Sequence, residues 1–256
     1  MSSAATETRP LPMEGRDSFQ FLGFTRARAI FFLAFVVVVV VSPLAVYPIF
    51  LMKVYCFIIF ACAYNLLLGY TGLMSFGHAA FFGMGAYLCG YAATQWGLPV
   101  GLAVLAGTAY AGLLGLVFGW IAIRRQGLYF GMITLALAQM VYFVALKAPF
   151  TGGEDGIQSV PRGTLFGLVD LSSNMALYWT LSVILLAVLV FYNRIVHSPF
   201  GQVLRAIRNN PDRTKSLGVD VDRFKLLSFV ISAALSGFAA SLKTVLFGIA
   251  TLTDVS

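Results

Sequence analysis

Charged residues are scarce in this sequence. They make up 11% of it, whereas a typical soluble domain has about a quarter. Apolar residues account for 59%, and the mean hydropathy is +0.88. This composition excludes an ordinary soluble domain and indicates an all-α, polytopic integral membrane protein.

Acidic residues are missing from a long stretch of the chain. None occurs from residue 18 to residue 153, between Asp17 and Glu154. Carriers driven by protons or sodium ions usually place Asp or Glu inside the bilayer to relay or bind the ion. The gap therefore disfavours an ion-coupled carrier. If the chain moves a solute uphill, we expect the energy to enter from another polypeptide.

Motifs for nucleotide binding, metal binding and catalysis are missing too. No G-x-x-x-x-G-K-[ST] loop occurs, so we expect no ATP on this chain. The histidines, His78 and His197, are far apart, and the three cysteines lack metal-ligand spacing, so we expect no metal. No nucleophile, base and orienting group recur at plausible spacing, which disfavours an enzyme. The net charge of +7 comes from basic residues beside apolar runs instead of one patch, which disfavours nucleic-acid binding.

Long uncharged runs predict the number of membrane crossings. Such runs cover residues 29–52, 54–123, 126–146 and 171–193, and a further run from Leu226 is interrupted only by Lys243. A span needs about 20 residues. The longest run then holds three spans, with breaks at 69–72 and 95–99, and about seven crossings result. We expect the membrane domain to cover residues 29–256.

Basic residues near span ends predict the orientation, because they are retained in the cytoplasm. Residues 194–225 carry seven Lys and Arg, whereas 149–175 carry only Arg162 beside three acids. The first segment is predicted to be cytoplasmic and the second, an external loop, periplasmic. Counting back places the tail of residues 1–28 in the cytoplasm. Within that tail, residues 18–24 fit either an interfacial helix or a plain disordered segment.

A pair of short helices is predicted in the cytoplasmic segment 196–224. Ser198-Pro199 and Asn210-Pro211 are helix start signals, Gly218 is placed to end the second helix, and Asp222 is placed to cap the next span. The apolar face of the first helix suggests a protruding helix pair that presents apolar and basic side chains to another protein. A pair of helices lying on lipid headgroups fits the periodicity equally well.

Three stretches resemble a known family. They are "GLMSFGHAAFFGMGAY" (72–87), "TGGEDGI" (151–157) and the run from Ser198 to Leu242 that begins "SPFGQVLRAIRNNPD". In this order they resemble the inner-membrane permease of branched-chain amino-acid ABC importers. Family members continue past the position of Ser256, so the chain looks incomplete at its C-terminus.

The resemblance implies partners and a mechanism. Two related permease chains form the pore in the bacterial inner membrane, two cytoplasmic ABC ATPases bind ATP, and a periplasmic binding protein delivers the solute. The segment matching 199–218 looks like the helix that couples to the ATPase, which favours the protein-partner interpretation. The residues expected at this contact are Phe200, Gly201, Val203, Leu204, Arg205, Ile207, Arg208, Asn210 and Gly218. Arg213, Thr214 and Lys215 stand where relatives usually have small Ala residues.

Polar residues and glycines interrupt the apolar stretch 64–91. The glycines are expected where backbones approach closely or a helix breaks beside a cavity, and the stretch fits either two full spans or a broken or re-entrant helix. Its polar and aromatic side chains fit a substrate path, although Asn, Ser and His in spans also serve as hydrogen-bond partners between helices. The candidate path residues are Asn65, Ser75, Phe76, Gly77, His78 and Phe81, with Phe82 beside them.

Small residues at four-residue spacing predict close helix packing. Gly97 and Gly101 have this spacing, as do Gly115 and Gly119. Ser232, Ser236 and Ala240 repeat it in the last span, where we expect contact with the partner permease. Lys243 lies near the end of that span and is expected to extend outward to the membrane surface.

The loop "TGGEDGI" is predicted to make a compact reversal at the outer mouth. Adjacent glycines permit positive φ, and Asp155-Gly156 is a turn dipeptide. Its backbone N–H groups suit either a simple tight turn or an anion-binding concavity. The candidate residues are Thr151, Gly152, Gly153, Asp155 and Gly156. Residues 163–171 then suggest a short element on the membrane surface where a delivery protein docks.

Alternatives to this function stay open. Related permeases carry urea or short amides, and no residue from 64 to 91 distinguishes these solutes from Leu, Ile and Val. An ion-driven carrier or channel would need no ATPase. Only the importer requires a tightly bound nucleotide-hydrolysing partner.

Overall fold

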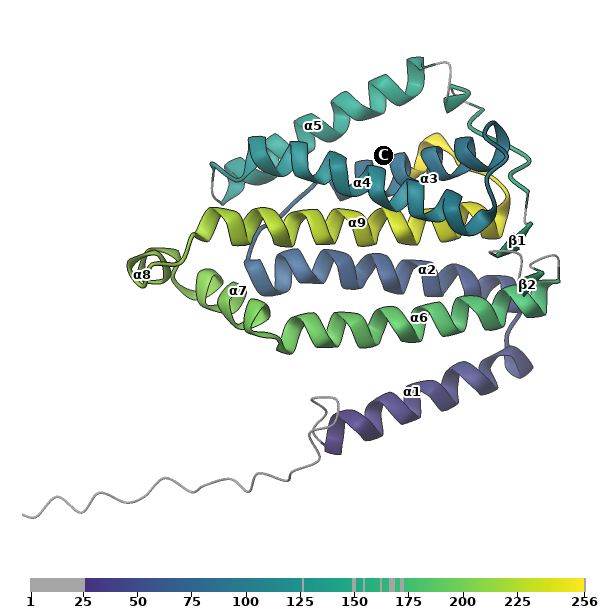
Figure 1. The fold of residues 1–256 in the computed structure, drawn as a ribbon, viewed down its shortest axis with the longest axis horizontal. Helices are drawn as coiled ribbons and strands as arrows, with labels where there is room; N and C mark the ends of the chain where they lie inside the picture. The colour runs from purple at the N-terminus through teal and green to yellow at the C-terminus, as the bar shows by residue number, and fades with distance from the viewer. Residues whose placement is uncertain are drawn as a thin grey trace, which may run out of the picture.

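The computed structural model describes residues 26–125, 127–148, 151–153, 155–161, 163–165, 169–170 and 173–255. These residues form a bundle of helices with one very short antiparallel hairpin (Figure 1). The tail segment 18–24 lies outside the described residues. The all-α membrane fold predicted from composition is confirmed.

The elements follow the chain in a simple order. The α-helices are α1 (Arg26–Ala45), α2 (Pro48–Asn65), α3 (His78–Thr94), α4 (Val100–Ala122), α5 (Leu128–Lys147), α6 (Asn174–His197), α7 (Pro199–Asn209), α8 (Pro211–Ser216) and α9 (Val221–Phe247). A π-helix, η1 (Leu66–Thr71), extends α2, and a 3-10 turn, η3 (Leu252–Asp254), follows α9. The hairpin joins β1 (Thr164–Leu165) to β2 (Val169–Asp170), with Thr164 opposite Asp170.

Five helices are long and apolar enough to cross a membrane, counted over the described residues. They are Pro48–Thr71, Val100–Ala122, Leu128–Lys147, Asn174–His197 and Val221–Phe247. The other two predicted crossings correspond to α1 and to α3, which has 17 residues. Seven crossings and a cytoplasmic N-terminus stay predictions.

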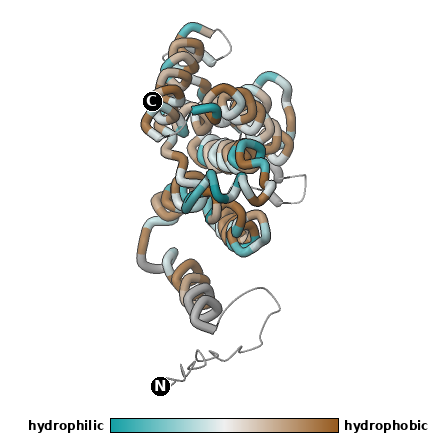
Figure 2. Tube along the Cα trace, turned by 90° about the vertical axis from the view of Figure 1, so that its left-hand side faces the viewer, coloured by the Kyte–Doolittle hydropathy of each residue, from teal (hydrophilic) through white to brown (hydrophobic). Residues whose placement is uncertain are grey.

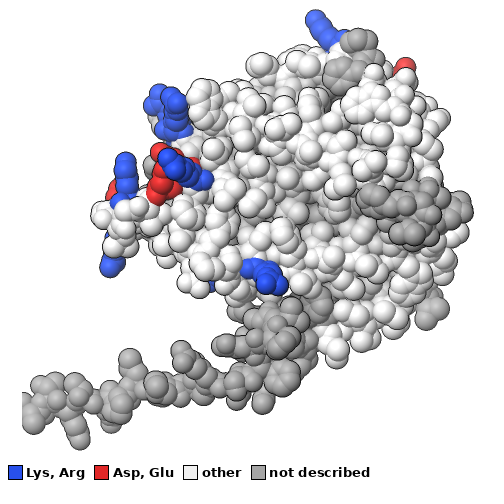
Figure 3. Space-filling view, in the orientation of Figure 1, with Lys and Arg blue, Asp and Glu red and all other residues white. Residues whose placement is uncertain are grey.

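The ends of the bundle differ in charge. Most of the Lys and Arg visible in Figure 3 lie at its left-hand end, where Figure 1 places α7 and α8. Figure 2 looks onto this end and shows hydrophilic segments among the hydrophobic helices. The hairpin and the turn between α3 and α4 lie at the opposite end (Figure 1). The basic segments that the sequence assigned to one side of the membrane thus gather at one end of the fold.

Helix α9 lies at the centre of the bundle, between α2 on one side and α3 and α4 on the other (Figure 1). Of its most apolar window, 72% is buried, against 33–44% for the other four long apolar helices. Its small side chains Ser232, Ser236 and Ala240 are fully buried within this chain. Our expectation that they face a partner permease is therefore wrong, because α2, α3 and α4 already cover them.

Glycines allow the backbones of α3, α4 and α9 to touch. A Cβ on Gly85 would lie 2.6 Å from Gly237 Cα, and one on Gly107 would lie 2.5 Å from the Gly85 carbonyl oxygen. Gly115 makes the same kind of contact, since its Cβ would lie 2.4 Å from Ala233 Cβ. The close packing predicted for Gly115 is confirmed. The prediction for Gly97 is wrong, because it lies in a turn with φ +61° and has no atom within 4 Å of an added Cβ.

The stretch 64–91 forms one long helix and then a helix that begins inside the bundle. Helix α2 continues through η1 and ends at Gly72, which has φ +75°. Residues 72–77 then lead back into the bundle, where α3 begins (Figure 1). Ser75, Gly77 and His78 are buried at this start. With 17 residues, α3 is about 26 Å long, so the broken-helix alternative fits better than two equal spans.

A hydrogen-bonded cluster ties α1 to the bundle. The Tyr178 hydroxyl lies 2.8 Å from that of Tyr55 and 3.0 Å from Ser42 Oγ, and it donates to the Val39 carbonyl. The cluster joins α1, α2 and α6 close to Pro43, which lies inside α1. These polar groups satisfy one another in the last turns of α1, close to its proline.

Gly107→Ala is expected to lower the thermal unfolding midpoint of the detergent-solubilised protein. The new methyl would lie 2.4 Å from Ser241 Oγ and 2.5 Å from the Gly85 carbonyl oxygen, and overpacking of this kind costs about 1–3 kcal/mol. Gly112→Ala is the matched control on the same helix, because its methyl would meet only Ala234 Cβ at 3.5 Å. Equal midpoints for the two variants would contradict the close packing of α3, α4 and α9.

Candidate functional site

The two short helices predicted after residue 197 are present. Ser198 Oγ accepts from the Gly201 N–H, and Asn210 Oδ1 accepts from the Arg213 N–H at 3.0 Å. Gly218, with φ +84°, follows α8 as expected. The cap of α9 differs from the prediction, because Asp220 accepts from the Arg223 N–H and Asp222 lies in the first turn.

The apolar face of α7 is turned toward the bundle. Gly201, Leu204 and Ile207 are buried, and Leu204 packs in a cluster with Leu66 and Val196. The prediction that this segment shows its apolar side chains to the cytoplasm is therefore wrong for Leu204 and Ile207. The same burial argues against a helix pair lying on lipid headgroups, since the face that would enter lipid is already occupied.

Other predicted contact residues of this segment are less buried. Phe200 and Val203 are half-buried, and the Phe200 ring stacks on Phe224 with centroids 5.8 Å apart. Arg205, Arg208, Asn210 and Gly218 are exposed. In α8, Thr214 is buried and donates to the Asn210 carbonyl at 2.9 Å, whereas Arg213 and Lys215 are exposed. The exposed face is thus mainly basic and polar.

Two arginines join α7 to the end of α2. The Arg208 guanidinium donates to the Gly69 carbonyl in η1. Arg205 donates to the Val196 carbonyl at 2.9 Å and lies 5.4 Å from the centroid of the Tyr70 ring. A Cβ on Gly72 would lie 3.1 Å from Arg208 Cγ. The sequence did not predict these contacts, because a π-helical extension of α2 has no clear signal in a uniformly apolar run.

The six candidate path residues have different neighbours in the described part of the chain. Asn65 is exposed and donates to the Tyr192 hydroxyl at 2.9 Å. Phe76 is 52% exposed and lies against Gly131. Gly77 packs against the Thr134 backbone, and Ser75 is buried beside it. Phe81 is buried in the core.

His78 lies in an aromatic cage at the junction of α3 and α9. Its Nε2 is 2.8 Å from Ser232 Oγ, and Ser232 donates to the Ala63 carbonyl of α2. Its ring makes edge contacts with Tyr64, Phe81 and Phe229, at centroid distances of 5.4–6.0 Å. Nδ1 has no hydrogen-bond partner among the described residues. These contacts fit a hydrogen bond between helices, and a place on the substrate path stays a prediction.

The external loop holds the segment that follows α9. Gly152, Gly153 and Gly156 have φ between +62° and +75°, as a compact reversal requires, and Thr151 donates to the Ala148 carbonyl at 2.7 Å. Beyond Asp155, the backbones of Ile157 and Ala250 exchange hydrogen bonds of 2.9 and 3.0 Å. The Ile157 N–H is therefore used in this pairing, and anion binding by the loop stays a prediction.

Lys243 does not extend outward. Its ammonium forms an ion pair with Asp254 in η3, and the two side chains are 17% and 8% exposed. The expectation for Lys243 is wrong because the chain turns back after α9 and supplies a carboxylate (Figure 1). Lys243, the residue that interrupts the last apolar run, was the signal in the sequence that could have found this pair.

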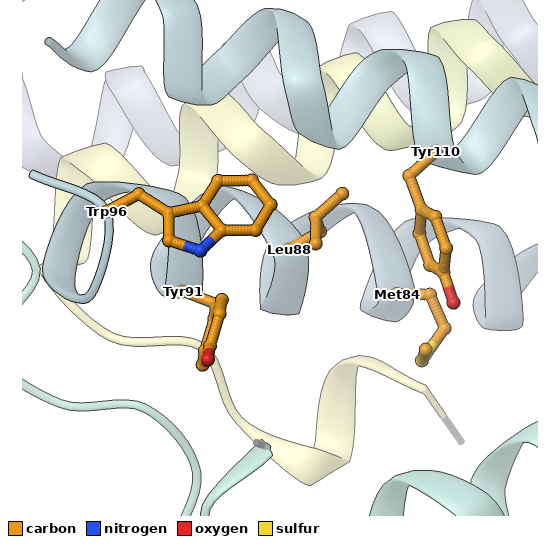
Figure 4. Close-up of a pocket in the computed structure, with 5 residues that line it drawn as sticks. All are labelled: Met84, Leu88, Tyr91, Trp96 and Tyr110. Carbon is orange, nitrogen blue, oxygen red and sulfur yellow. The ribbon is translucent and has the colours of Figure 1, made fainter. Parts of the chain in front are cut away.

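Two cavities lie near this turn. One is a groove of about 270 Å³ between α3 and α4, lined by Met84, Leu88, Tyr91, Trp96 and Tyr110 (Figure 4). The other measures about 200 Å³ and is lined by Phe57, Phe60, Ala79, Phe82, Thr253 and Asp254. The first contains no charged side chain, whereas the second contains the Asp254 carboxylate. Only the second joins an apolar wall to an ion pair.

Long apolar helices, a helix broken inside the bundle and a basic end define a multi-pass transport permease of the inner membrane. Residues 46–256 match the family described as "Branched-chain amino acid transport system / permease component". The chain belongs to this permease family, and the resemblance seen in its sequence is confirmed.

Individual relatives carry the same description. The high-affinity branched-chain amino acid transport system permease protein LivM of Escherichia coli (strain K12) is 30% identical over 209 residues, or 73% of this chain and 49% of the relative. LivM of Salmonella typhimurium gives the same identity and shares. A probable permease protein LivH of Methanocaldococcus jannaschii is 35% identical over 60 residues, 23% of this chain and 19% of the relative. The chain spans about half the length of the two bacterial relatives. No solved structure matches it significantly.

Leu204→Ala is expected to release α7 from the bundle in the solubilised chain. Removing a fully buried leucine costs about 2–5 kcal/mol, so trypsin cleavage after Arg205 and Arg208 should become at least about tenfold faster. Gln202→Ala is the control, because Gln202 is exposed on the same helix. A cleavage rate equal to that of the wild type would show that Leu204 does not anchor α7.

Proposed function

We propose that this chain is the transmembrane permease subunit of an ATP-driven importer for branched-chain amino acids. The observation that carries the proposal is the family match over residues 46–256. The chain forms half of the translocation pore, and a homologous second permease forms the other half. Relatives named LivM and LivH support two related permeases. A periplasmic binding protein delivers the solute.

The energy comes from two cytoplasmic ATPase subunits, because this chain has no nucleotide-binding loop. They dock on the exposed face of α7 and α8. This face carries Arg205, Arg208, Arg213 and Lys215. The apolar face of α7 transmits the force, since Leu204 and Ile207 fix the helix to the bundle.

Movement of α7 is transmitted to the membrane helices through η1. Arg208 binds the Gly69 carbonyl, so a displacement of α7 pulls on the last turn of the helix that begins as α2. Residues 72–77 follow directly, and α3 begins at their end. ATP binding closes the ATPases, carries the two coupling segments together and switches the bundle between outward-open and inward-open states.

The orientation that this function requires has a direct test. Leu217→Cys should react with a membrane-impermeant maleimide only after cells are permeabilised, because residue 217 is 77% exposed at the predicted cytoplasmic end. Trp96→Cys, at a position 58% exposed at the opposite end, is the matched control and should react in intact cells. Labelling of Leu217→Cys in intact cells would leave the ATPases without a docking site and would end the proposal.

Coupling is tested with Arg208→Met in the full-length chain, assembled with its partners in proteoliposomes. The variant keeps an apolar stem but loses the donor to Gly69, so leucine uptake per ATP hydrolysed should fall at least about threefold, as expected for a charged hydrogen bond worth ~1.5–3 kcal/mol. Lys53→Met removes an exposed charge outside the docking face and should keep the wild-type ratio. Uptake of urea or short amides but not of leucine would show that the proposed solute is wrong. Uptake without ATP would show that the proposed mechanism is wrong.

A further inference from the structure

The ion pair between Lys243 and Asp254 lies where burying a charge is energetically unfavourable. Both side chains are largely buried among apolar helices. Removing two charges from water costs about as much as their attraction returns, so a buried pair is weak support for a purely stabilising role. Ionisable residues at membrane depth usually mark a path for a solute or an ion. Lys243 lies four residues before the end of α9, or about 6 Å along the helix.

The cavity beside this pair has an apolar wall. Phe60 and Phe82 pack edge to face with centroids 5.1 Å apart, and Phe57 stacks on Phe82 at 6.1 Å. The Lys243 ammonium lies 5.6 Å from the centroid of the Phe82 ring. Phe57 is 44% exposed, so this chain leaves one side of the cavity uncovered. A carboxylate and an aromatic surface therefore line one cavity of about 200 Å³, and the Lys243 ammonium pairs with that carboxylate beside the Phe82 ring.

Helix α3 carries a further buried polar group, on Tyr87. The Tyr87 hydroxyl is buried and has no hydrogen-bond partner among the described residues. A buried hydroxyl without a partner costs about 1–3 kcal/mol.

The segment that carries Asp254 is held from two sides. Its start pairs with the external loop, where the Val160 N–H donates to the Gly248 carbonyl at 2.9 Å. Its end packs on α3, since a Cβ on Gly83 would lie 2.2 Å from Val255 Cγ2. Asp254 is therefore fixed against α3 and α9 and not displayed on a free loop.

From this geometry we infer that the cavity is a binding site for a zwitterionic amino acid with an aliphatic side chain. The α-ammonium group binds the Asp254 carboxylate, the α-carboxylate binds the Lys243 ammonium, and the side chain lies against the Phe57, Phe60 and Phe82 rings. The inference rests on the proposed function, and it assigns the transported amino acid to the cavity at Asp254.

Other cavities fit this ligand less well. The groove in Figure 4 has aromatic walls but no charge. A cavity of about 210 Å³ between α4 and α9 includes Arg124, Asp222 and Arg223. The Arg223 side chain there is 87% exposed and pairs with Asp220, so water screens its charge. Of these three cavities among the described residues, the one at Asp254 is the one that lies beside a largely buried ion pair.

The decisive experiment replaces both charges by apolar groups in the full-length chain, assembled with its partners in proteoliposomes. Lys243→Met combined with Asp254→Leu removes the ion pair without leaving a lone charge, and such replacements are often neutral or stabilising. We expect the double variant to keep the wild-type unfolding midpoint. Leucine uptake should fall about 30-fold or more, because both charged contacts to the ligand are lost.

The outcomes separate the two proposals. If the double variant imports leucine at the wild-type rate, the pair is only structural and this inference fails, while the proposed function stands. If the wild-type assembly imports no aliphatic amino acid, the proposed function fails and the inference falls with it. Single variants should lose uptake as well, but they leave an unpaired buried charge and cannot decide alone.

A second measurement needs no change in charge. Ala79→Leu fills the cavity and should lower leucine uptake at least about tenfold relative to alanine uptake, as expected when a site loses the room for an isobutyl group. Leu88→Phe, in the uncharged groove, is the matched control and should change neither.

Competition completes the test on the wild-type assembly without its binding protein. 3-Methylbutylamine and 4-methylpentanoate should each displace bound radiolabelled leucine about 30-fold less effectively than leucine itself, because each lacks one charged group. Equal displacement by either analogue would overturn the assignment.

Discussion

The close approach of α9 to α3 and α4 is the contact on which the rest of this structure depends. Lipid tails are as apolar as the helix surfaces, so hydrophobic burial does not drive helices together in a bilayer, and packing at short distance must do so. Gly85, Gly107 and Gly237 bring the three backbones into contact. Ser241 then reaches the Gly237 carbonyl at 2.8 Å and the Gly85 carbonyl at 3.3 Å. A larger residue at any of the three glycines would displace the helix that carries Lys243.

The same packing makes the broken helix possible. Irregular backbone survives at membrane depth only where protein covers it, because lipid offers no hydrogen-bond partners. In the link 72–77, the Phe76 N–H donates to Thr134 Oγ1 at 3.2 Å, and the Leu73 N–H donates to the Leu67 carbonyl at 3.3 Å. Helix α5 supplies the first partner and η1 the second. The interruption that the glycines of this stretch predicted is therefore stabilised by neighbouring elements, together with a hydrogen bond of 3.4 Å from the Gly77 N–H to Ser75 Oγ within the link.

Local features of the fold could be predicted from the sequence, and long-range partners could not. The caps at Ser198 and Asn210, the turn at Gly218 and the packing of Gly115 depend on a few adjacent residues or on helical spacing. The direction of the apolar face of α7 depends on η1, which lies about 130 residues earlier in the chain. The partner of Lys243 depends on a turn after α9 that no apolar pattern marks. The sequence indicates candidate path residues only by their chemical type, because their neighbours come from distant parts of the chain. In the structure these residues face several different neighbours.

Helix α3 connects the basic end of the molecule to the cavity at Asp254. At the basic end, α7 holds η1, and η1 leads through the link 72–77 to the start of α3. At the other end, α3 presents Phe82 to the aromatic cavity and Gly83 to Val255, next to Asp254. Contact alone transmits nothing unless an element has two discrete arrangements that both sites bias. The link is the element suited to this, because Gly72 and Gly77 allow a change of backbone conformation at either end at little cost. Helix α9, buried on most sides, is the fixed support against which α3 would move.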